Sequence, residues 1–364
     1  MIILVVTAGH QPSDDRIYYK EIITLLDAGH HVVLVTKNQH ETLPANKLFL
    51  HINYNVSSLR EFVKKTVDYA TEFNPDKIII HEMELLPLGQ KLKKQIKADY
   101  IYDIHEAHIE MWDAFSTKPT LIKTIINWGL YVYEQHHLRN MDRALTPSPV
   151  IVDRYIQQGI KTYFIPNYPR LIPSKQRNDS PTINLIYHGQ ISTERGIGDL
   201  IEAMSLLKVG EQNIKLEVYG KERLPGTVKF FEKQVRNLDL ERVISFHASI
   251  PYDEIIEKIH DADIGVIPFR DLPMFRIAVP IKLFEYMMCN CAVIASDLPL
   301  IREFAKENID FFKTENVQNL ADKLSVLIND ETKRNTLKKS GRKMVERKYN
   351  WAHVEPAFLN AVIG

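Results

Sequence analysis

Short apolar runs alternate with helically spaced apolar residues along this chain, and the alternation predicts an α/β fold. Residues 2–7 and 31–36 are continuous apolar runs of the kind found in buried parallel strands. Between them, apolar residues recur at helical spacing from Tyr18 to Leu26, and Gly29 can end that helix. Together these segments form one strand–helix–strand unit. It lacks the glycine-rich fingerprint of dinucleotide-binding folds, so no dinucleotide cofactor is indicated.

The same alternation continues to the end of the chain. Further strands are expected at residues 77–81, 100–104, 143–146, 183–188, 215–219, 243–246, 264–267, 291–296 and 309–312. Helices are expected at residues 59–70, 85–96, 149–157, 280–290, 299–306 and 320–327. This order of elements favours parallel sheets covered by helices.

A proline-rich stretch divides the chain near its middle. Four prolines occur between residues 165 and 182, together with serine, asparagine and aspartate, which is typical of a linker between domains. We therefore expect a first domain at residues 1–165, a linker at 166–182, a second domain at 183–345 and a C-terminal helical segment at 346–364.

Composition and charge narrow the class of protein. The 364 residues carry 46 basic and 46 acidic side chains, so the overall charge does not point to nucleic acid. No apolar run approaches the roughly 18 residues of a membrane span. The chain opens on a strand rather than a signal peptide, and its two cysteines, Cys289 and Cys291, cannot form a disulfide framework. These features predict a cytoplasmic protein.

Candidate chemistry is concentrated in residues 280–297, PIKLFEYMMCNCAVIASD, which predict a helix followed by a buried strand. Lys282 and Glu285 lie three residues apart near the start of that helix, so their side chains are neighbours. A cation, free N–H groups and the helix dipole together suit a phosphate group, and a carboxylate one turn later can accept hydrogen bonds from sugar hydroxyls. The alternative is an exposed lysine–glutamate pair contributing roughly 0.3–0.5 kcal/mol.

The segments PIKLFEYM and CAVIASDLP resemble the donor-binding helix and strand of family 4 (group 1) glycosyltransferases of the GT-B fold. The resemblance implies two Rossmann-like domains facing a central cleft, with a C-terminal helix crossing back to the first domain. It also implies that Glu285 binds the ribose of a nucleotide sugar, with Lys282 near the diphosphate and Leu283 in the same donor site. The family usually carries an earlier glutamate, where this chain has Ile277.

The loop after the strand at residues 183–188 carries further family-like positions. Gly189, Arg195 and Gly196 match the family's phosphate-binding loop, whereas Gln190 stands where an arginine is usual. Arg195 is the expected diphosphate ligand, because a guanidinium can bind two oxygens at once. The alternative is a solvated loop arginine. Ile250 is expected to stack on the base of the nucleotide.

The first domain is expected to supply contacts on the acceptor side. The run DDRIYYKEIITLLDAGHHVVLVT resembles the opening of family 4 enzymes, where the loop after the first strand faces the substrate cleft. Gly9 and Arg16 are therefore candidates for substrate contact. The alternative for both residues is turn and capping chemistry, and Asp14 or Asp15 can cap the helix that follows.

His105 follows the strand at residues 100–104, at the sheet edge where ligands of α/β folds collect. The phrase IYDIHE resembles the family segment whose histidine lies against the donor sugar. His105 would then donate a hydrogen bond to a sugar hydroxyl or support developing charge. Two alternatives remain: a histidine that only completes the strand end, and a zinc ligand acting with His108.

Two further patterns have a structural as well as a functional interpretation. Residues 112–139 are rich in aromatic residues and carry lysines, which suits either an anionic membrane surface or a helix packed on its own sheet. The motif Asp261-Ala-Asp263 resembles a metal-binding D-x-D, but it precedes a strand instead of ending one. We expect a helix end there and no metal.

Taken together, the sequence predicts a hexosyltransferase that moves a sugar from a nucleotide-sugar donor to a saccharide or lipid-linked acceptor. Retention of anomeric configuration is implied by the resemblance, and we expect no cofactor, no metal and no nucleic acid. The setting would be the synthesis of surface polysaccharide or glycolipid, with peripheral contact to the inner membrane surface. Two alternatives stay open: a sugar-nucleotide epimerase of the same fold, and a non-catalytic subunit that binds sugar nucleotides. The sequence indicates no oligomeric state.

Overall fold

The computed structural model describes residues 1–364 except 40, 42, 106–107, 117, 176–180 and 208–212. Its contacts divide the chain into two compact units. Unit 1 comprises Met1–Asn167 together with Ala352–Gly364, and unit 2 comprises Tyr168–Trp351. Residues 176–180 of the expected linker lie outside the described residues.

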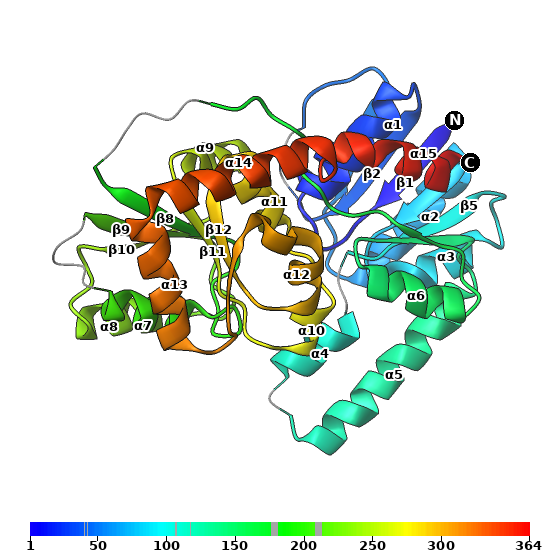
Figure 1. Ribbon diagram of the computed structural model, residues 1–364. Helices are drawn as coiled ribbons and strands as arrows, with labels where there is room; N and C mark the ends of the chain where they lie inside the picture. The colour runs from blue at the N-terminus through cyan, green and yellow to red at the C-terminus, as the bar shows by residue number, and fades with distance from the viewer. Residues whose placement is uncertain (40, 42, 106–107, 117, 176–180, 208–212) are drawn as a thin grey trace. The chain divides into compact units, whose positions relative to one another are not determined.

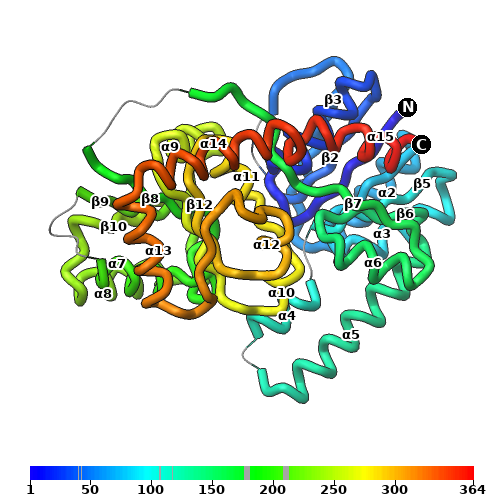
Figure 2. The backbone as a smooth tube through the Cα atoms, in the orientation of Figure 1, coloured from blue at the N-terminus to red at the C-terminus, as the bar shows by residue number. Residues whose placement is uncertain are grey.

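Unit 1 is built on a seven-stranded parallel sheet of order β3-β2-β1-β4-β5-β6-β7. Its strands are β1 (Ile2–Val6), β2 (His31–Lys37), β3 (Phe49–Tyr54), β4 (Lys77–Ile80), β5 (Asp99–Asp103), β6 (Arg143–Thr146) and β7 (Thr162–Phe164). Figure 2 traces the backbone of this unit, with strands β2, β3, β5, β6 and β7 labelled. Its helices are η1 (Asp15–Ile22), α1 (Ile23–Asp27), α2 (Leu59–Phe73), η2 (Met83–Leu85), α3 (Leu86–Leu92), α4 (His108–Phe115), α5 (Thr120–Leu138), α6 (Pro149–Gln157) and α15 (Glu355–Ile363).

Unit 2 repeats this design with a six-stranded parallel sheet of order β10-β9-β8-β11-β12-β13. Its strands are β8 (Ile183–His188), β9 (Ile214–Tyr219), β10 (Ile244–His247), β11 (Ile264–Ile267), β12 (Ala292–Ser296) and β13 (Asp310–Phe312). Its helices are α7 (Ile197–Leu206), α8 (Thr227–Asn237), α9 (Tyr252–His260), α10 (Pro273–Arg276), α11 (Ile281–Met288), α12 (Pro299–Ala305), η3 (Lys306–Asn308), α13 (Val317–Asn329) and α14 (Glu331–Arg347). A short turn, η4 (Trp351–His353), leads back to unit 1.

The strand order explains where each unit can hold a ligand. In both sheets the chain starts in the middle, builds outward to one side and then returns to build the other side. The reversal occurs between β1 and β4 in unit 1 and between β8 and β11 in unit 2. Ligands of such sheets bind beyond the carboxyl ends of the strands at this reversal.

The last helix belongs to unit 1 and lies beside α1 (Figure 1). Thr24 Oγ1 donates a hydrogen bond to Glu355 Oε1 over 3.3 Å. Arg143 Nη1 donates to the carbonyl of Ala361 over 2.9 Å, at the end of α15. The helix is therefore held at both ends by side chains of the first 167 residues.

The α/β expectation is confirmed, and most expected strands and helices are present at nearly the expected positions. Several details of the sequence-based expectation were wrong or incomplete, and helices α8 and α14 were not among the expected ones. Strands β3 and β7 were not expected, residues 112–139 form parts of two helices instead of one, and Pro280 is the N-cap of α11 instead of lying in its first turn. Asn290 adopts the left-handed conformation (φ 58°) that was expected of a helix-ending asparagine.

Candidate functional site

Lys282 lies buried in unit 2, on the first turn of α11. Its side chain is 4% exposed, its ammonium group donates a hydrogen bond to the carbonyl of His188, and it lies 4.0 Å from the ring centroid of Tyr187. Glu285, one turn later, is 3% exposed. The interpretation of these two residues as an exposed lysine–glutamate pair was therefore wrong.

Arg195 shares an aromatic neighbour with Lys282. Its guanidinium carbon lies 5.1 Å from the ring centroid of Phe269 and 5.5 Å from that of Phe275, and the ammonium of Lys282 lies 5.4 Å from the same Phe269 ring. The structure thus brings both expected phosphate ligands to one ring, directly after β11. The alternative of a solvated loop arginine does not fit this position.

Two glycines make this approach sterically feasible. Gly189 has φ 115°, and a Cβ added there would lie 2.9 Å from the ammonium nitrogen of Lys282. Gly196 has φ 72°, and a Cβ there would lie 1.7 Å from the carbonyl oxygen of Pro268. Only glycine combines these backbone angles with such close contacts. The loop after β8 can therefore lie directly on the chain that follows β11.

The electrostatics of this site favour an anion. Burial lowers the pKa of Lys282 well below its usual value, and the positive charge of Arg195 lowers it further, although Glu285 opposes the shift. The buried ammonium of Lys282 lacks full solvation and is repelled by the nearby guanidinium of Arg195. A bound diphosphate would supply the negative charge that offsets these two positive groups.

His188 links Lys282 and Glu285. Its carbonyl accepts from Lys282, and its Nε2 lies 3.1 Å from Glu285 Oε2. Burial lowers the pKa of His188, while the carboxylate of Glu285 opposes that shift. Sequence reasoning did not single out His188, although its place at the end of β8 could have suggested it.

A cavity of about 450 Å³ opens beside these residues. It is lined by His188, Gly189 and Gln190, by residues 219–223 after β9, and by Ser249, Ile250 and Ile255. The structure therefore brings the expected donor residues Gly189, Gln190 and Ile250 to one hollow. Leu283 is fully buried, at 0% exposure, and is not among the residues that line this cavity.

In unit 1, Arg16 lies inside the protein instead of in an open loop. Its side chain is 3% exposed, and its Nε and Nη2 donate to the two carboxylate oxygens of Asp103 over 2.8 and 2.7 Å. Its Nη1 donates to the carbonyl of Ile165, and its Nε lies 2.9 Å from Glu21. The structure places Arg16 as the partner of a buried carboxylate, which neither turn nor capping chemistry describes.

Gly9 is exposed, and its N–H donates to Glu82 Oε1 over 2.9 Å. The same carboxylate accepts from the N–H of Ala8 and the hydroxyl of Thr7. The loop after β1 is thus wrapped around a carboxylate that follows β4. Asp14 caps η1, as expected, by accepting from the N–H groups of Arg16 and Ile17.

His105 lies at the end of β5, where its Nε2 is 3.0 Å from Asp103 Oδ2 and 2.8 Å from His81 Nδ1. Its ring centroid is 4.8 Å from that of His10. Among the described residues, the groups of potential metal ligands that include His105 contain His10, His81 or carboxylates but not His108. Zinc held by His105 with His108 therefore finds no support. Glu106, in the same motif, lies outside the described residues.

The D-x-D motif has structural partners. Asp263 Oδ2 accepts from the N–H of Asn184 over 3.0 Å, and its Oδ1 accepts from Lys338 Nζ over 2.9 Å. Asp261 ends α9. These contacts fit the expected helix end and strand entry.

Helix α5 leaves large apolar side chains in solvent. The exposed ones are Leu121, Ile122, Ile125, Trp128, Tyr131 and Val132, with Leu121 at 73% and Trp128 at 68% exposure. Packing against its own sheet therefore does not account for this face of the helix. None of the helices in the described part of the chain has the length and hydropathy needed to span a membrane.

Comparisons with known proteins show similarity to glycosyltransferases. Residues 170–344 match the family model of glycosyl transferases group 1. The chain is 27% identical over 187 residues to a lipopolysaccharide 1,2-N-acetylglucosaminetransferase of Salmonella typhimurium, covering 48% of this chain and 46% of that protein. It thus spans about half the length of the curated relative that it matches.

Solved structures resemble the whole chain. Sucrose-phosphate synthase from Thermosynechococcus elongatus superposes with a TM-score of 0.77 at 18% identity, over 99% of this chain and 97% of that chain. The Anabaena protein HepE, solved in complex with UDP and glucose, superposes with a TM-score of 0.73 at 15% identity. The match covers 99% of this chain and 98% of that chain. With the two parallel sheets, these likenesses confirm the expected GT-B fold class.

Proposed function

We propose that the protein is a glycosyltransferase, because residues 170–344 match the family model of glycosyl transferases group 1. It takes a sugar from a nucleotide-sugar donor and transfers it to a saccharide or lipid-linked acceptor. The single observation that carries the proposal is that Lys282 and Arg195 meet at the Phe269 ring, beside the 450 Å³ cavity.

Breaking the bond between a sugar and a diphosphate leaves negative charge on the departing nucleotide. Lys282 and Arg195 are placed to stabilise that charge, because both are held near each other before substrate arrives. The first N–H groups of α11 add to this field. Two side-chain cations and a helix end supply the positive charge for the leaving group, which is why we propose that departure of the nucleotide needs no metal.

Glu285 is the group that we expect to bind the ribose. Its carboxylate lies beside His188, and His188 also lines the cavity. Ile250 and Ile255 give that cavity an apolar wall on which a base can rest. The relative HepE was solved with UDP, which supports a uridine nucleotide as the first donor to test.

The curated relative points to the kind of acceptor. It is named as an enzyme of lipopolysaccharide, which supports an acceptor built of sugars on a lipid carrier and a role in surface polysaccharide or glycolipid synthesis. Retention of anomeric configuration is proposed from the family resemblance.

The test is incubation of the protein with a panel of nucleotide sugars, with and without lipid-linked saccharide. We expect release of nucleoside diphosphate that increases when the acceptor is added. Glu285→Gln should abolish that release while Glu303→Gln, an exposed glutamate of the same unit, leaves it unchanged. An isomerised sugar with no release would instead identify an epimerase, and binding without turnover a non-catalytic subunit; either result overturns the proposal.

We also propose that α5 rests on an anionic membrane surface. Leu121, Ile125, Trp128 and Val132 repeat at alternating steps of four and three residues, so they form one stripe on the helix. Trp128 and Tyr131 are residue types that prefer the interface between lipid and water. Lys118 and Lys123 stand at the start of the helix and suit anionic headgroups.

Sedimentation with lipid vesicles tests the membrane proposal. The protein should bind vesicles that contain anionic phospholipid more strongly than neutral ones. Replacing Leu121 and Trp128 together by serine should reduce binding about tenfold or more, because each large side chain contributes roughly 1.5–3 kcal/mol when buried. Phe230→Ser is the matched control, since Phe230 is 62% exposed in unit 2. Equal binding by both variants would contradict a role for α5.

A further inference from the structure

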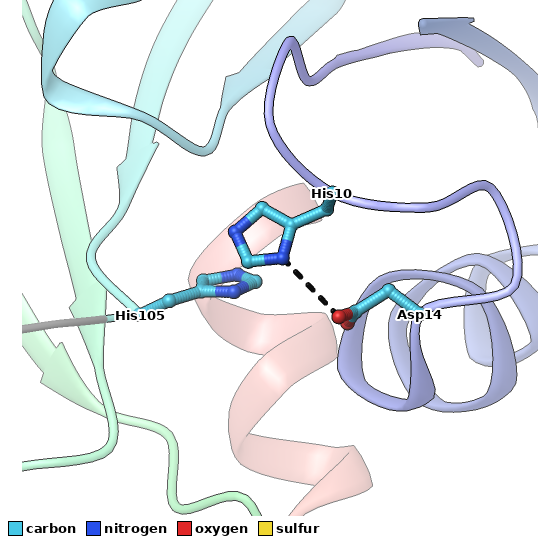
Figure 3. A group of neighbouring side chains, drawn as sticks. All are labelled: His10, Asp14 and His105. Atoms are coloured by element: carbon cyan, nitrogen blue, oxygen red, sulfur yellow. Dashed lines mark hydrogen bonds and ion pairs between the residues drawn. The ribbon is translucent and has the colours of Figure 1, made fainter. Parts of the chain in front are cut away.

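Unit 1 gathers histidines and carboxylates at the point where its strand order reverses. His10 follows β1, His81 and Glu82 follow β4, and His105 follows β5. Figure 3 shows His10 and His105 facing each other, with Asp14 beside them at the start of η1. None of these residues takes part in the donor site of unit 2 described above.

The charges in this cluster do not balance. The carboxylates of Asp14, Glu21, Glu82 and Asp103 each lie within 3.9 Å of one of its histidines. The guanidinium of Arg16 is the cation that binds Asp103, and it is shared with Glu21. Burying this excess of carboxylates is costly unless positive charge is added. The histidines can supply it by taking up protons, or a metal ion can supply it.

The geometry favours a metal ion at one end of the cluster. The ligand atoms of His10, Asp14 and His105 lie within 4.8 Å of one another, and His10 Nδ1 is 3.2 Å from Asp14 Oδ2. Ligands around one tetrahedral ion are about 3.4 Å apart. His10 and Asp14 are 26% and 27% exposed, so small rotations can bring their ligand atoms closer to His105.

Asp103 prepares His105 for this role. His105 Nε2 lies 3.0 Å from Asp103 Oδ2, so this nitrogen can donate its proton to the carboxylate. The other ring nitrogen, Nδ1, then carries the lone pair that a metal needs. Histidine ligands of metals commonly donate their second N–H to a carboxylate in this way. Arg16 holds Asp103 in place from the opposite side with two hydrogen bonds.

A second group, His81 with Asp103 and His105, has shorter distances between its ligand atoms but is less suitable for a metal ion. Its ligand atoms are 2.8–3.6 Å apart, yet both carboxylate oxygens of Asp103 already accept from Arg16. The guanidinium would repel a cation there, and His81 and Asp103 are 1% and 0% exposed. The partly exposed group of His10, Asp14 and His105 is therefore the better site.

We propose that His10, Asp14 and His105 bind one divalent first-row transition-metal ion. Two imidazoles and one carboxylate suit zinc, cobalt, manganese or iron. Three protein ligands leave at least one coordination position for water or for a hydroxyl oxygen. The site is separate from the leaving-group chemistry of Lys282 and Arg195, so it can exist whether or not the proposed glycosyltransferase activity is found.

The test uses the full chain without a polyhistidine tag, titrated with Co²⁺ and followed by visible absorption, and with Zn²⁺ followed by calorimetry. We expect one ion per chain and a change in the cobalt spectrum. His10→Gln should weaken binding about tenfold or more, the size of effect that even outer-shell partners of metal ligands have. Asp14→Asn should do the same, and it keeps the oxygen that caps η1, so the fold is retained.

His136→Gln is the matched control, because His136 is an exposed histidine of the same unit. It should leave the affinity and the cobalt spectrum unchanged. Failure of the wild-type chain to take up either ion would overturn the proposal and assign the positive charge to protons on the histidines. Binding that both ligand variants retain would overturn it as well, since the ion would then sit elsewhere.

Discussion

The ammonium group of Lys282 lies 4.0 Å from the centre of the Tyr187 ring and donates its hydrogen bond to the backbone of the following residue, His188. A buried cation is thus held by the face of an aromatic ring and a carbonyl. Burial also raises the pKa of Tyr187 to about 12, although Arg195 opposes the shift, so the ring remains neutral. Such an arrangement holds a charge ready for a ligand at the expense of stability.

We therefore predict that Lys282→Met separates binding from stability. Affinity for a nucleoside diphosphate should fall about tenfold to a hundredfold, since a charged hydrogen bond contributes roughly 1.5–3 kcal/mol. The free energy of unfolding should rise by about 1 kcal/mol, because a buried charge is replaced by an apolar chain of similar length. Calorimetric titration and denaturant unfolding measure the two effects. Lys229→Met, at an exposed lysine of the same unit, should change neither.

Gly196→Ala should be among the most damaging substitutions of a single methyl group. Left-handed backbone costs a residue with a Cβ about 1–2 kcal/mol, and the clash with the carbonyl of Pro268 adds about 1–3 kcal/mol. Gly29→Ala is the control, because Gly29 has φ 81° but no atom within 4 Å of an added Cβ. Gly29→Ala should lower the free energy of unfolding only by the cost of the left-handed backbone, about 1–2 kcal/mol. If urea unfolding shows equal decreases in the free energy of unfolding for both variants, the close approach to Pro268 is unimportant.

Removing the charge of Asp103 should destabilise unit 1 strongly. Burial alone would raise the pKa of this carboxyl, but Arg16 and His105 outweigh burial and hold the pKa well below its usual value. Asp103→Asn removes the carboxylate that accepts two hydrogen bonds from Arg16 and leaves only Glu21 as an acidic neighbour of that buried guanidinium, and breaking such a buried pair typically costs about 3–5 kcal/mol. Asp99→Asn breaks contacts of Asp99, which is 38% exposed, with Lys77 and Arg143, and should cost less than about 1 kcal/mol. Similar decreases in the free energy of unfolding for both variants would contradict the stabilising role of the buried Asp103–Arg16 pair.

His81 should make the protein less stable in mild acid. Burial lowers the pKa of His81 well below the ordinary value of 6.5, and His105 lowers it further, so the folded protein keeps this ring neutral. In the unfolded chain the same ring takes up a proton below pH 6.5, and the free energy of unfolding therefore decreases as pH falls through that value.

Thermal unfolding above and below pH 6.5 measures this dependence. His81→Gln should flatten the slope with pH, whatever its effect on stability at neutral pH. His31→Gln, at an exposed histidine of the same unit, should keep the wild-type slope. A steep slope that persists without His81 would assign the dependence to other groups.

Local patterns were sufficient for much of the fold. Residues 2–6 and 292–296 are continuous apolar runs, and both became central parallel strands because such strands are buried on both faces. Strand β3 escaped notice because its sequence, FLHINY, mixes polar with apolar residues and lies at the edge of the sheet. The break between α4 and α5 was missed although Ser116, Lys118 and Pro119 interrupt the apolar pattern there, and Pro119 is the N-cap of α5.

The site was only partly predictable for a similar reason. Spacing and the family resemblance indicated Lys282, Glu285 and Arg195, whereas the contacts of His188 with Glu285 and of Lys282 with Phe269 join residues from different strands and loops. Arg16 was expected to face a substrate, yet its partner Asp103 is 87 residues away along the chain. Local sequence cannot reveal a counterion that only the folded sheet brings close.

By itself, the sequence determined the α/β alternation and the helix that carries Lys282, since these depend on apolar periodicity and on residues close together in the chain. Only the tertiary structure decided that Lys282 and Arg195 share the Phe269 ring, and that three strands bring His10, His81 and His105 together. The physical reason is that burial and charge depend on every neighbour in space, and in a parallel sheet those neighbours come from strands that are distant in sequence.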